Sequence, residues 1–207
     1  MNEVSTRKGK VVIVSGPSGV GKSTICKGVV KQLNSVYLSV SVTTRPRGAG
    51  ETHGKDYWFV SEQEFQEMIK RGLLLEHAEV FGHLYGTPKD RVDEALQAGK
   101  TVILEIDVQG AKQAKLFFPD AVMIFILPPS AKVLAERMGR RGREDTRIAE
   151  ERLNGASNEI AAAWQYYEHM VINEDLQQAV REVAQIIEGG SGSKSQNGDR
   201  QTSVGEK

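Results

Sequence analysis

Residues 16–23 read Gly16-Pro17-Ser18-Gly19-Val20-Gly21-Lys22-Ser23 and fit G-x-x-x-x-G-K-[ST], the pattern of a phosphate-binding P-loop. Glycine adopts positive φ angles without a Cβ clash, so successive backbone N–H groups of such a loop can converge on phosphate oxygens. We expect Lys22 to reach the β- and γ-phosphates and the Ser23 hydroxyl to take a place on Mg²⁺. The sequence therefore predicts binding of a nucleoside triphosphate.

The residues around this loop indicate an α/β fold. A β-branched run at 11–14 is typical of a buried parallel strand, and apolar residues recur at helical spacing from Ile25 to Leu33. Strand–helix repetition along the chain predicts a parallel sheet flanked by helices, with ligands beyond the carboxyl ends of the strands. Strands are predicted over 11–15, 37–42, 101–106, 121–127 and 170–173. Helices are predicted over 22–33, 61–71, 88–98, 108–117, 130–139, 144–167 and 175–187.

Two segments depart from this repetition. Residues 40–90 carry short, aromatic-rich strand candidates punctuated by glycines, which indicates a small mixed-β insertion, with a helix that starts at the capping box Ser61–Glu64. Residues 189–207 have almost no apolar side chain and are expected to form a disordered tail.

Composition limits the partners. The chain has 27 basic and 27 acidic residues, and this neutrality argues against a large nonspecific nucleic-acid surface. No apolar run is long enough to span a membrane and no signal peptide is recognised, so we expect a cytoplasmic protein with neither a nucleic acid nor a membrane as partner. The single cysteine, Cys26, is expected to be a buried apolar residue rather than a metal ligand. A monomer and a homo-oligomer both remain open.

Charged residues near the ends of predicted elements suggest phosphoryl transfer. Arg137, Arg140 and Arg141 cluster around the end of the predicted helix over 130–139, and Arg143, Arg147 and Arg152 follow them. Arginine binds phosphate bidentately and stays charged, although any one of these residues could belong to a solvated basic face. Asp107 ends an apolar strand and could hold Mg²⁺, the alternative being an ordinary strand-end cap.

Taken together, the motifs resemble those of the guanylate kinase family from residue 10 to about residue 187. The resemblance rests on residues 15–24, Ser41-Val42-Thr43-Thr44-Arg45, Gly54-Lys55-Asp56-Tyr57, Glu76, Tyr85-Gly86-Thr87, Leu104-Glu105-Ile106-Asp107-Val108-Gln109-Gly110, Pro128-Pro129-Ser130, Arg137 with Arg140-Arg141-Gly142, Arg152-Leu153 and Val171-Ile172-Asn173. It implies Mg²⁺-dependent transfer of the ATP γ-phosphoryl group to GMP or dGMP, giving ADP and GDP, in purine nucleotide metabolism. It also implies a P-loop core (1–39, 91–131 and 163–188), a GMP-binding subdomain (40–90) and a helical lid (132–162).

The resemblance further implies roles for individual residues. The catalytic residues would be Lys22, Arg45, Arg137, Arg141 and Arg152. The ATP-binding residues would be Gly16, Pro17, Ser18, Gly19, Val20, Gly21, Lys22, Ser23, Thr24 and Asn173. The GMP-binding residues would be Ser41, Arg45, Arg47, Tyr57, Glu76, Tyr85, Thr87 and Asp107, with Glu76 and Thr87 reading the guanine. Mg²⁺ would be held by Ser23 and Asp107.

One position departs from the family pattern. The family usually carries a second loop arginine three residues after the first, whereas here that place is Gly48 and the second arginine, Arg47, comes one position early.

Two alternative functions are a non-catalytic guanylate-kinase-like module that binds phosphopeptides, and a P-loop kinase for another small substrate. The retained Lys22, Ser23, Arg137 and Arg141 disfavour the former, and Glu76, Thr87 and the Thr43-Thr44-Arg45 loop disfavour the latter.

Overall fold

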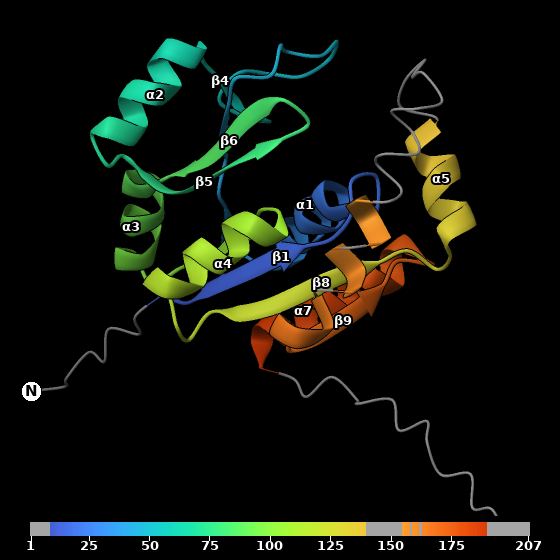
Figure 1. The fold of residues 1–207 in the computed structure, drawn as a ribbon. Coiled ribbons are helices and arrows are strands. Elements are labelled where there is room, and N and C mark those ends of the chain that lie inside the picture. Colours follow the sequence, from blue (N-terminus) through green and yellow to red (C-terminus); the bar gives the residue numbers. More distant parts are fainter. Residues whose placement is uncertain (1–8, 140–154, 158, 162, 190–207) are drawn as a thin grey trace, which may run out of the picture.

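The fold is seen in a computed structural model that describes residues 9–139, 155–157, 159–161 and 163–189 (Figure 1). A five-stranded sheet in the order β2-β7-β1-β8-β9 lies at the centre, and all its neighbouring strands pair in parallel. Its strands are β1 (Val11–Ser15), β2 (Val36–Leu38), β7 (Thr101–Glu105), β8 (Val122–Leu127) and β9 (His169–Ile172). This arrangement confirms the predicted α/β class with a parallel sheet flanked by helices.

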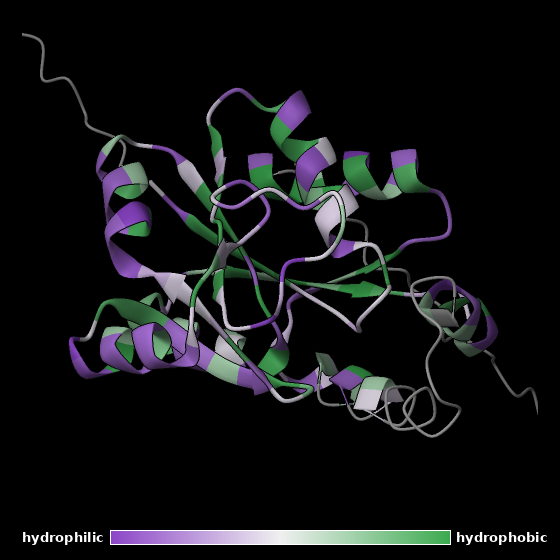
Figure 2. Cartoon of the chain, turned by 90° about the horizontal axis from the view of Figure 1, so that it is seen from above, coloured by the Kyte–Doolittle hydropathy of each residue, from purple (hydrophilic) through white to green (hydrophobic). Residues whose placement is uncertain are grey.

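Helices cover both faces of the central sheet. Side chains alternate along β1, so Val12 and Val14 pack on one face and Val11 and Ile13 on the other. The first face is covered by α1 (Lys22–Gln32) and α7 (Leu176–Glu188), and the second by α3 (Lys89–Gln97) and α4 (Val108–Phe117). The hydrophobic colouring of the central strands in Figure 2 fits a sheet buried on both sides. Cys26 is fully buried in this core, as predicted.

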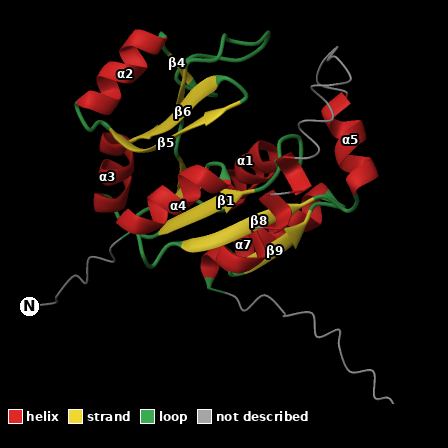
Figure 3. Cartoon of the chain, viewed as in Figure 1, coloured by secondary structure: helices red, strands yellow, loops and turns green. Residues whose placement is uncertain are grey.

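A second sheet lies apart from the core, next to α2 (Figure 3). It has four strands in the order β4-β3-β6-β5, with β3 and β4 parallel and the other pairs antiparallel. The strands are β3 (Val42–Thr43), β4 (Trp58–Phe59), β5 (Leu74–Val80) and β6 (His83–Pro88). Helix α2 (Glu62–Lys70) begins at Ser61 with both hydrogen bonds of the predicted capping box to Glu64. The predicted mixed-β insertion is therefore present.

The predicted single strand over 37–42 is wrong. The structure divides it into β2, which pairs with β7 in the central sheet, and β3, which pairs with β4 and β6 in the second sheet. The Ser39 N–H donates to Ile103 O at 3.0 Å, whereas the Ser41 carbonyl accepts from Trp58 N at 2.8 Å. The chain thus changes sheets between these two serines, and its uninterrupted polar–apolar alternation gives no sign of the change of partner.

Helix α5 (Ala131–Gly139) starts after Ser130, whose hydroxyl accepts a hydrogen bond from the Val133 N–H at 3.2 Å, as expected of a cap.

The predicted helix over 144–167 lies partly outside the described residues, and within them residues 155–157, 159–161 and 163–166 are helical. The predicted tail lies outside them from residue 190 onward. Within the described ranges, no helix is both long and apolar enough to cross a membrane.

Candidate active site

The P-loop joins the carboxyl end of β1 to the first turn of α1. Gly19 and Gly21 have φ angles of 81° and 104°, in the left-handed region that favours glycine. These angles turn the loop back over the start of α1, where free backbone N–H groups and the helix dipole favour an anion. The predicted phosphate cradle therefore lies at the edge of the sheet where α/β proteins bind ligands.

Lys22 lies over the loop that carries it. Its Nζ donates to the carbonyl oxygens of Gly16 at 2.5 Å and Pro17 at 3.1 Å. Burial lowers the pKa of this ammonium group, while the nearby carboxylates of Glu105 and Glu159 act in the opposite direction. A phosphate would offer the ammonium group stronger hydrogen-bond acceptors than these two carbonyls.

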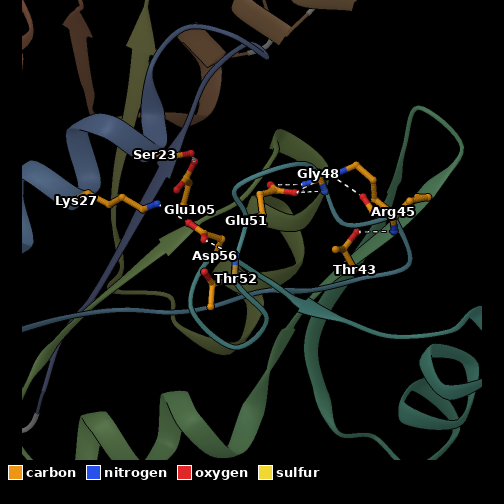
Figure 4. Close-up of polar contacts among 10 residues, drawn as sticks. Ser23, Lys27, Thr43, Arg45, Gly48, Glu51, Thr52, Asp56 and Glu105 are labelled. Atoms are coloured by element: carbon orange, nitrogen blue, oxygen red, sulfur yellow. Dashed lines mark hydrogen bonds and ion pairs between the residues drawn. The ribbon is translucent and has the colours of Figure 1, made fainter. Parts of the chain in front are cut away.

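Carboxylates at the end of β7 face the P-loop. The Ser23 hydroxyl donates to Glu105 Oε1 at 2.5 Å (Figure 4). Asp107 Oδ1 accepts the Gly110 N–H at 2.7 Å and caps α4, so the cap that was the alternative for this residue is present. Burial raises the pKa of Asp107. Ser23 and Asp107 thus lie at the same edge of the sheet, but the direct partner of Ser23 is Glu105.

Arg45 is held in a bidentate ion pair. Its Nη2 lies 2.7 Å from Glu51 Oε1 and its Nη1 lies 3.0 Å from Glu51 Oε2, and the Gly48 N–H donates to Oε2 at 2.7 Å (Figure 4). The hydrogen bond to Glu51 is the main reason that the pKa of Arg45 is raised, and the same bond lowers the pKa of Glu51. At Gly48, where the family pattern has its second arginine, the backbone N–H thus helps to hold the Glu51 carboxylate in place.

Aromatic rings surround the Arg45 guanidinium. Its Cζ lies 5.4 Å from the ring centroid of Tyr57 and 5.7 Å from that of Phe59, and the rings of Tyr57 and Tyr85 pack edge to face at 6.0 Å. Burial raises the pKa of Tyr57 to about 12. Three of the predicted GMP-binding residues, Arg45, Tyr57 and Tyr85, are therefore brought together, with the half-buried Ser41 just before β3.

Arg47 does not join this group. Its side chain is exposed and, among the residues described, makes no hydrogen bond or ion pair.

A buried polar pair lies on the facing strands β5 and β6. The Thr87 hydroxyl donates to Glu76 Oε1 at 2.6 Å, and the two residues are 0% and 4% exposed. Burial raises the pKa of Glu76 to about 7, against the effect of the Thr87 hydrogen bond. This carboxyl group can therefore exist in either protonation state near neutrality, and a ligand that donates hydrogen bonds would favour the ionised form.

Arg137 connects α5 to the P-loop. Its guanidinium donates to Val20 O at 3.4 Å and to Asn173 O at 3.1 Å, while Asn173 Nδ2 donates to Val20 O at 2.7 Å. Arg137 and Asn173 are therefore brought to the predicted triphosphate site. Arg141 and Arg152 lie outside the described residues.

An ion pair links the core to the insertion. Lys27 Nζ on α1 lies 2.7 Å from Asp56 Oδ1, and the Thr52 N–H donates to Asp56 Oδ2 at 2.9 Å (Figure 4). This contact brings the loop before β4 beside α1.

Sequence reasoning missed three carboxylates. Glu105 could have been found, because it is the one charged residue within the apolar β7 segment and shares its side of the strand with Asp107. Glu51 and Glu159 carry no such signal. Glu159 Oε2 is buried without a hydrogen-bond partner among the described residues, and burial raises its pKa to about 7 despite the attraction of Lys22.

The chain is similar to known guanylate kinases in sequence and in fold. The family model for guanylate kinase matches residues 8–189. A guanylate kinase from Carboxydothermus hydrogenoformans is 44% identical over 180 residues, which cover 87% of this chain and 88% of the relative. One from Clostridioides difficile is 44% identical over 181 residues, with 87% and 88% covered. The crystal structure of guanylate kinase from Anaplasma phagocytophilum superposes with a TM-score of 0.75 at 32% identity and covers 91% of this chain and 89% of that one.

Proposed function

The chain belongs to the guanylate kinase family of nucleoside monophosphate kinases, and we propose that it transfers the γ-phosphoryl group of ATP to GMP, giving ADP and GDP. The observation that carries this proposal is the buried Glu76–Thr87 pair. A carboxylate there can accept from guanine N1–H and the 2-amino group, a pair of donors that adenine lacks. A buried acceptor left unpaired is costly, so such a site discriminates strongly between bases.

The remaining residues supply positioning and charge. The P-loop residues Gly16 to Thr24, chiefly through their backbone N–H groups except at Pro17, would hold the ATP phosphates together with the Lys22 and Asn173 side chains. Arg45, Ser41, Tyr57 and Tyr85 would hold the phosphate of GMP, and Arg47 would reach it only if the loop moved. Because that phosphate is anionic near pH 7, it can attack without a general base. The two phosphoryl groups would meet between the P-loop and the Arg45 cluster.

Mg²⁺ fits the residues at the end of β7. Among the described residues no three His, Cys, Asp or Glu side chains form a metal cage. Mg²⁺ in kinases, however, is held by one or two protein oxygens together with phosphates and waters, and Ser23, Glu105 and Asp107 offer such oxygens beside the loop. When bound, the ion would neutralise charge on the transferring phosphate.

We propose the domain boundaries and the remaining residue roles from the same family membership. The core would comprise 1–39, 91–131 and 163–188, the GMP-binding subdomain 40–90 and the lid 132–162, with Arg137, Arg141 and Arg152 stabilising transition-state charge. dGMP would also be accepted, because the proposed guanine contacts do not use the ribose 2′-OH. We also propose a cytoplasmic role in purine nucleotide metabolism.

The test is ADP release coupled to a reporter, with ATP·Mg²⁺ and a panel of AMP, CMP, UMP, GMP and dGMP. GMP should give the highest kcat/KM, with dGMP next. Equal or faster turnover of AMP would overturn the assignment of the acceptor.

A further inference from the structure

Gly110 is the third residue of α4 and lies beside the buried carboxylate of Glu76. Its backbone gives no reason for glycine, because it is helical and its φ is not positive. Glycine destabilises a helix relative to alanine, since it fixes more backbone freedom on folding. The reason for glycine must therefore lie in what surrounds it.

A Cβ on Gly110 would meet the Glu76 carboxylate. It would overlap Glu76 Oε2 and lie 3.0 Å from Glu76 Cδ and 3.3 Å from Asp107 Oδ1. The Gly110 N–H is donated to Asp107 Oδ1 at 2.7 Å, so it does not hold Glu76 by a hydrogen bond. Gly110 therefore affects the Glu76 side chain only through the space that its missing Cβ leaves.

The helix and the strand around this contact are fixed to each other. Gln113 Nε2 donates to His77 O at 2.7 Å and Gln113 Oε1 accepts the His77 N–H at 3.3 Å, which joins α4 to β5 one residue beyond Glu76. On its other side, Glu76 Oε1 accepts from Thr87. The helix therefore cannot easily withdraw from an added methyl group, and the group that can move is the end of the Glu76 side chain.

We propose that Gly110 is a positioning residue for base selection, whose missing Cβ leaves the space in which the Glu76 carboxylate meets the acceptor base. The inference rests on the proposed function, because Glu76 reads a base only if the acceptor is a nucleotide. It extends that function to a residue that itself offers the base neither a donor nor an acceptor.

The first test is Gly110→Ala, assayed with GMP, IMP and AMP. IMP has the N1–H of guanine but no 2-amino group, so the GMP/IMP ratio of kcat/KM reports the carboxylate directly. We expect this ratio to fall at least about tenfold, mainly through the KM for GMP, while Tm falls only modestly, because alanine's better helix propensity offsets part of the crowding. Gln109→Ala, an exposed change in the same turn of α4, is the control and should leave the ratio within about twofold.

A second variant shortens the carboxylate. Glu76→Asp withdraws the carboxylate by one methylene, away from the position of the added Cβ. Glu76→Asp should therefore lower the GMP/IMP ratio less in the Gly110→Ala variant than in the wild type. Additive losses would overturn the proposal, as would a Gly110→Ala enzyme that keeps the wild-type ratio. A variant that unfolds, or that loses kcat on all acceptors equally, would show a merely structural role. If the wild type does not prefer GMP, the proposed function itself fails, which is a different outcome.

Discussion

The Ser23 hydroxyl and Glu105 Oε1 lie 2.5 Å apart, which links the first turn of α1 to the carboxyl end of β7 across the P-loop. The sequence separates these two residues by 82 positions. The pair brings together a hydroxyl expected on Mg²⁺ and a carboxylate that can receive or orient the ion and its waters.

The first prediction concerns this pair. Glu105→Gln keeps the shape of the side chain and removes its charge, so the Mg²⁺ concentration at half-maximal turnover should rise about tenfold or more. It is measured by titrating Mg²⁺ at fixed ATP and saturating GMP. Glu94→Gln, an exposed change on α3, controls for the altered net charge. An unchanged Mg²⁺ titration in Glu105→Gln would leave Glu105 as a partner of Ser23 with no role toward the ion.

Arg45 should act chiefly on GMP. Arg45→Lys keeps the positive charge but loses the planar fork now seen on Glu51, so the KM for GMP should rise about 10- to 100-fold. The KM for ATP should change little, and Arg71→Lys, at the exposed end of α2, is the matched control. Steady-state kinetics with each substrate varied in turn separates the two effects. A change confined to ATP would contradict the proposed assignment of the Arg45 cluster.

Lys22 should act on the donor. Its ammonium group lies on the carbonyls of Gly16 and Pro17, within the loop proposed for ATP. We expect Lys22→Ala to lower kcat by about 10²-fold or more while GMP affinity, measured by calorimetry, stays near the wild-type value. Lost GMP affinity with retained ATP turnover would reverse the roles of the two halves.

These contacts show what the sequence could and could not predict. The central strands β7 and β8 are long apolar runs, and the P-loop pattern fixes the turn between β1 and α1, so the core was predictable. The ion pair of Glu51 with Arg45 was not predictable, because it depends on the conformation of the loop that joins the two residues. The split of 37–42 into β2 and β3 was hidden for a related reason, since strand partners are set by residues far away in the chain.

The pKa of Glu76 makes stability depend on pH. Its pKa is raised from 4.5 to about 7 by burial, so between these values the unfolded state loses its proton while the folded state keeps it. This residue's contribution to the free energy of unfolding is therefore full below pH 4.5 and falls as the pH rises to about 7, by an amount on the order of 3 kcal/mol.

Glu76→Gln removes this dependence. The difference in the free energy of unfolding between the variant and the wild type, measured with urea at several pH values, should move in favour of the variant as the pH rises from about 4.5 to about 7. Glu159, whose pKa is also raised to about 7, contributes equally to both proteins and cancels in this comparison. A difference that does not vary with pH would mean that Glu76 ionises normally in the folded protein.

The arginines that follow α5 should act on the transition state. Arg137, in the last turn of α5, already contacts Val20 O of the P-loop and Asn173 O, and Arg141 comes four residues later in the sequence, outside the described residues. If this segment closes over the triphosphate, Arg141 meets charge that develops only as the phosphoryl group moves, and its loss should lower kcat by about 10³-fold or more with little effect on GMP affinity. Arg147 has no counterpart in the family motifs and should behave as a surface residue. Arg141→Ala and Arg147→Ala are therefore compared at saturating ATP·Mg²⁺ and GMP. Wild-type kcat in both would reduce the basic cluster to a solvated face, whereas equal losses in two folded variants would mean that the arginines have been assigned to the wrong positions.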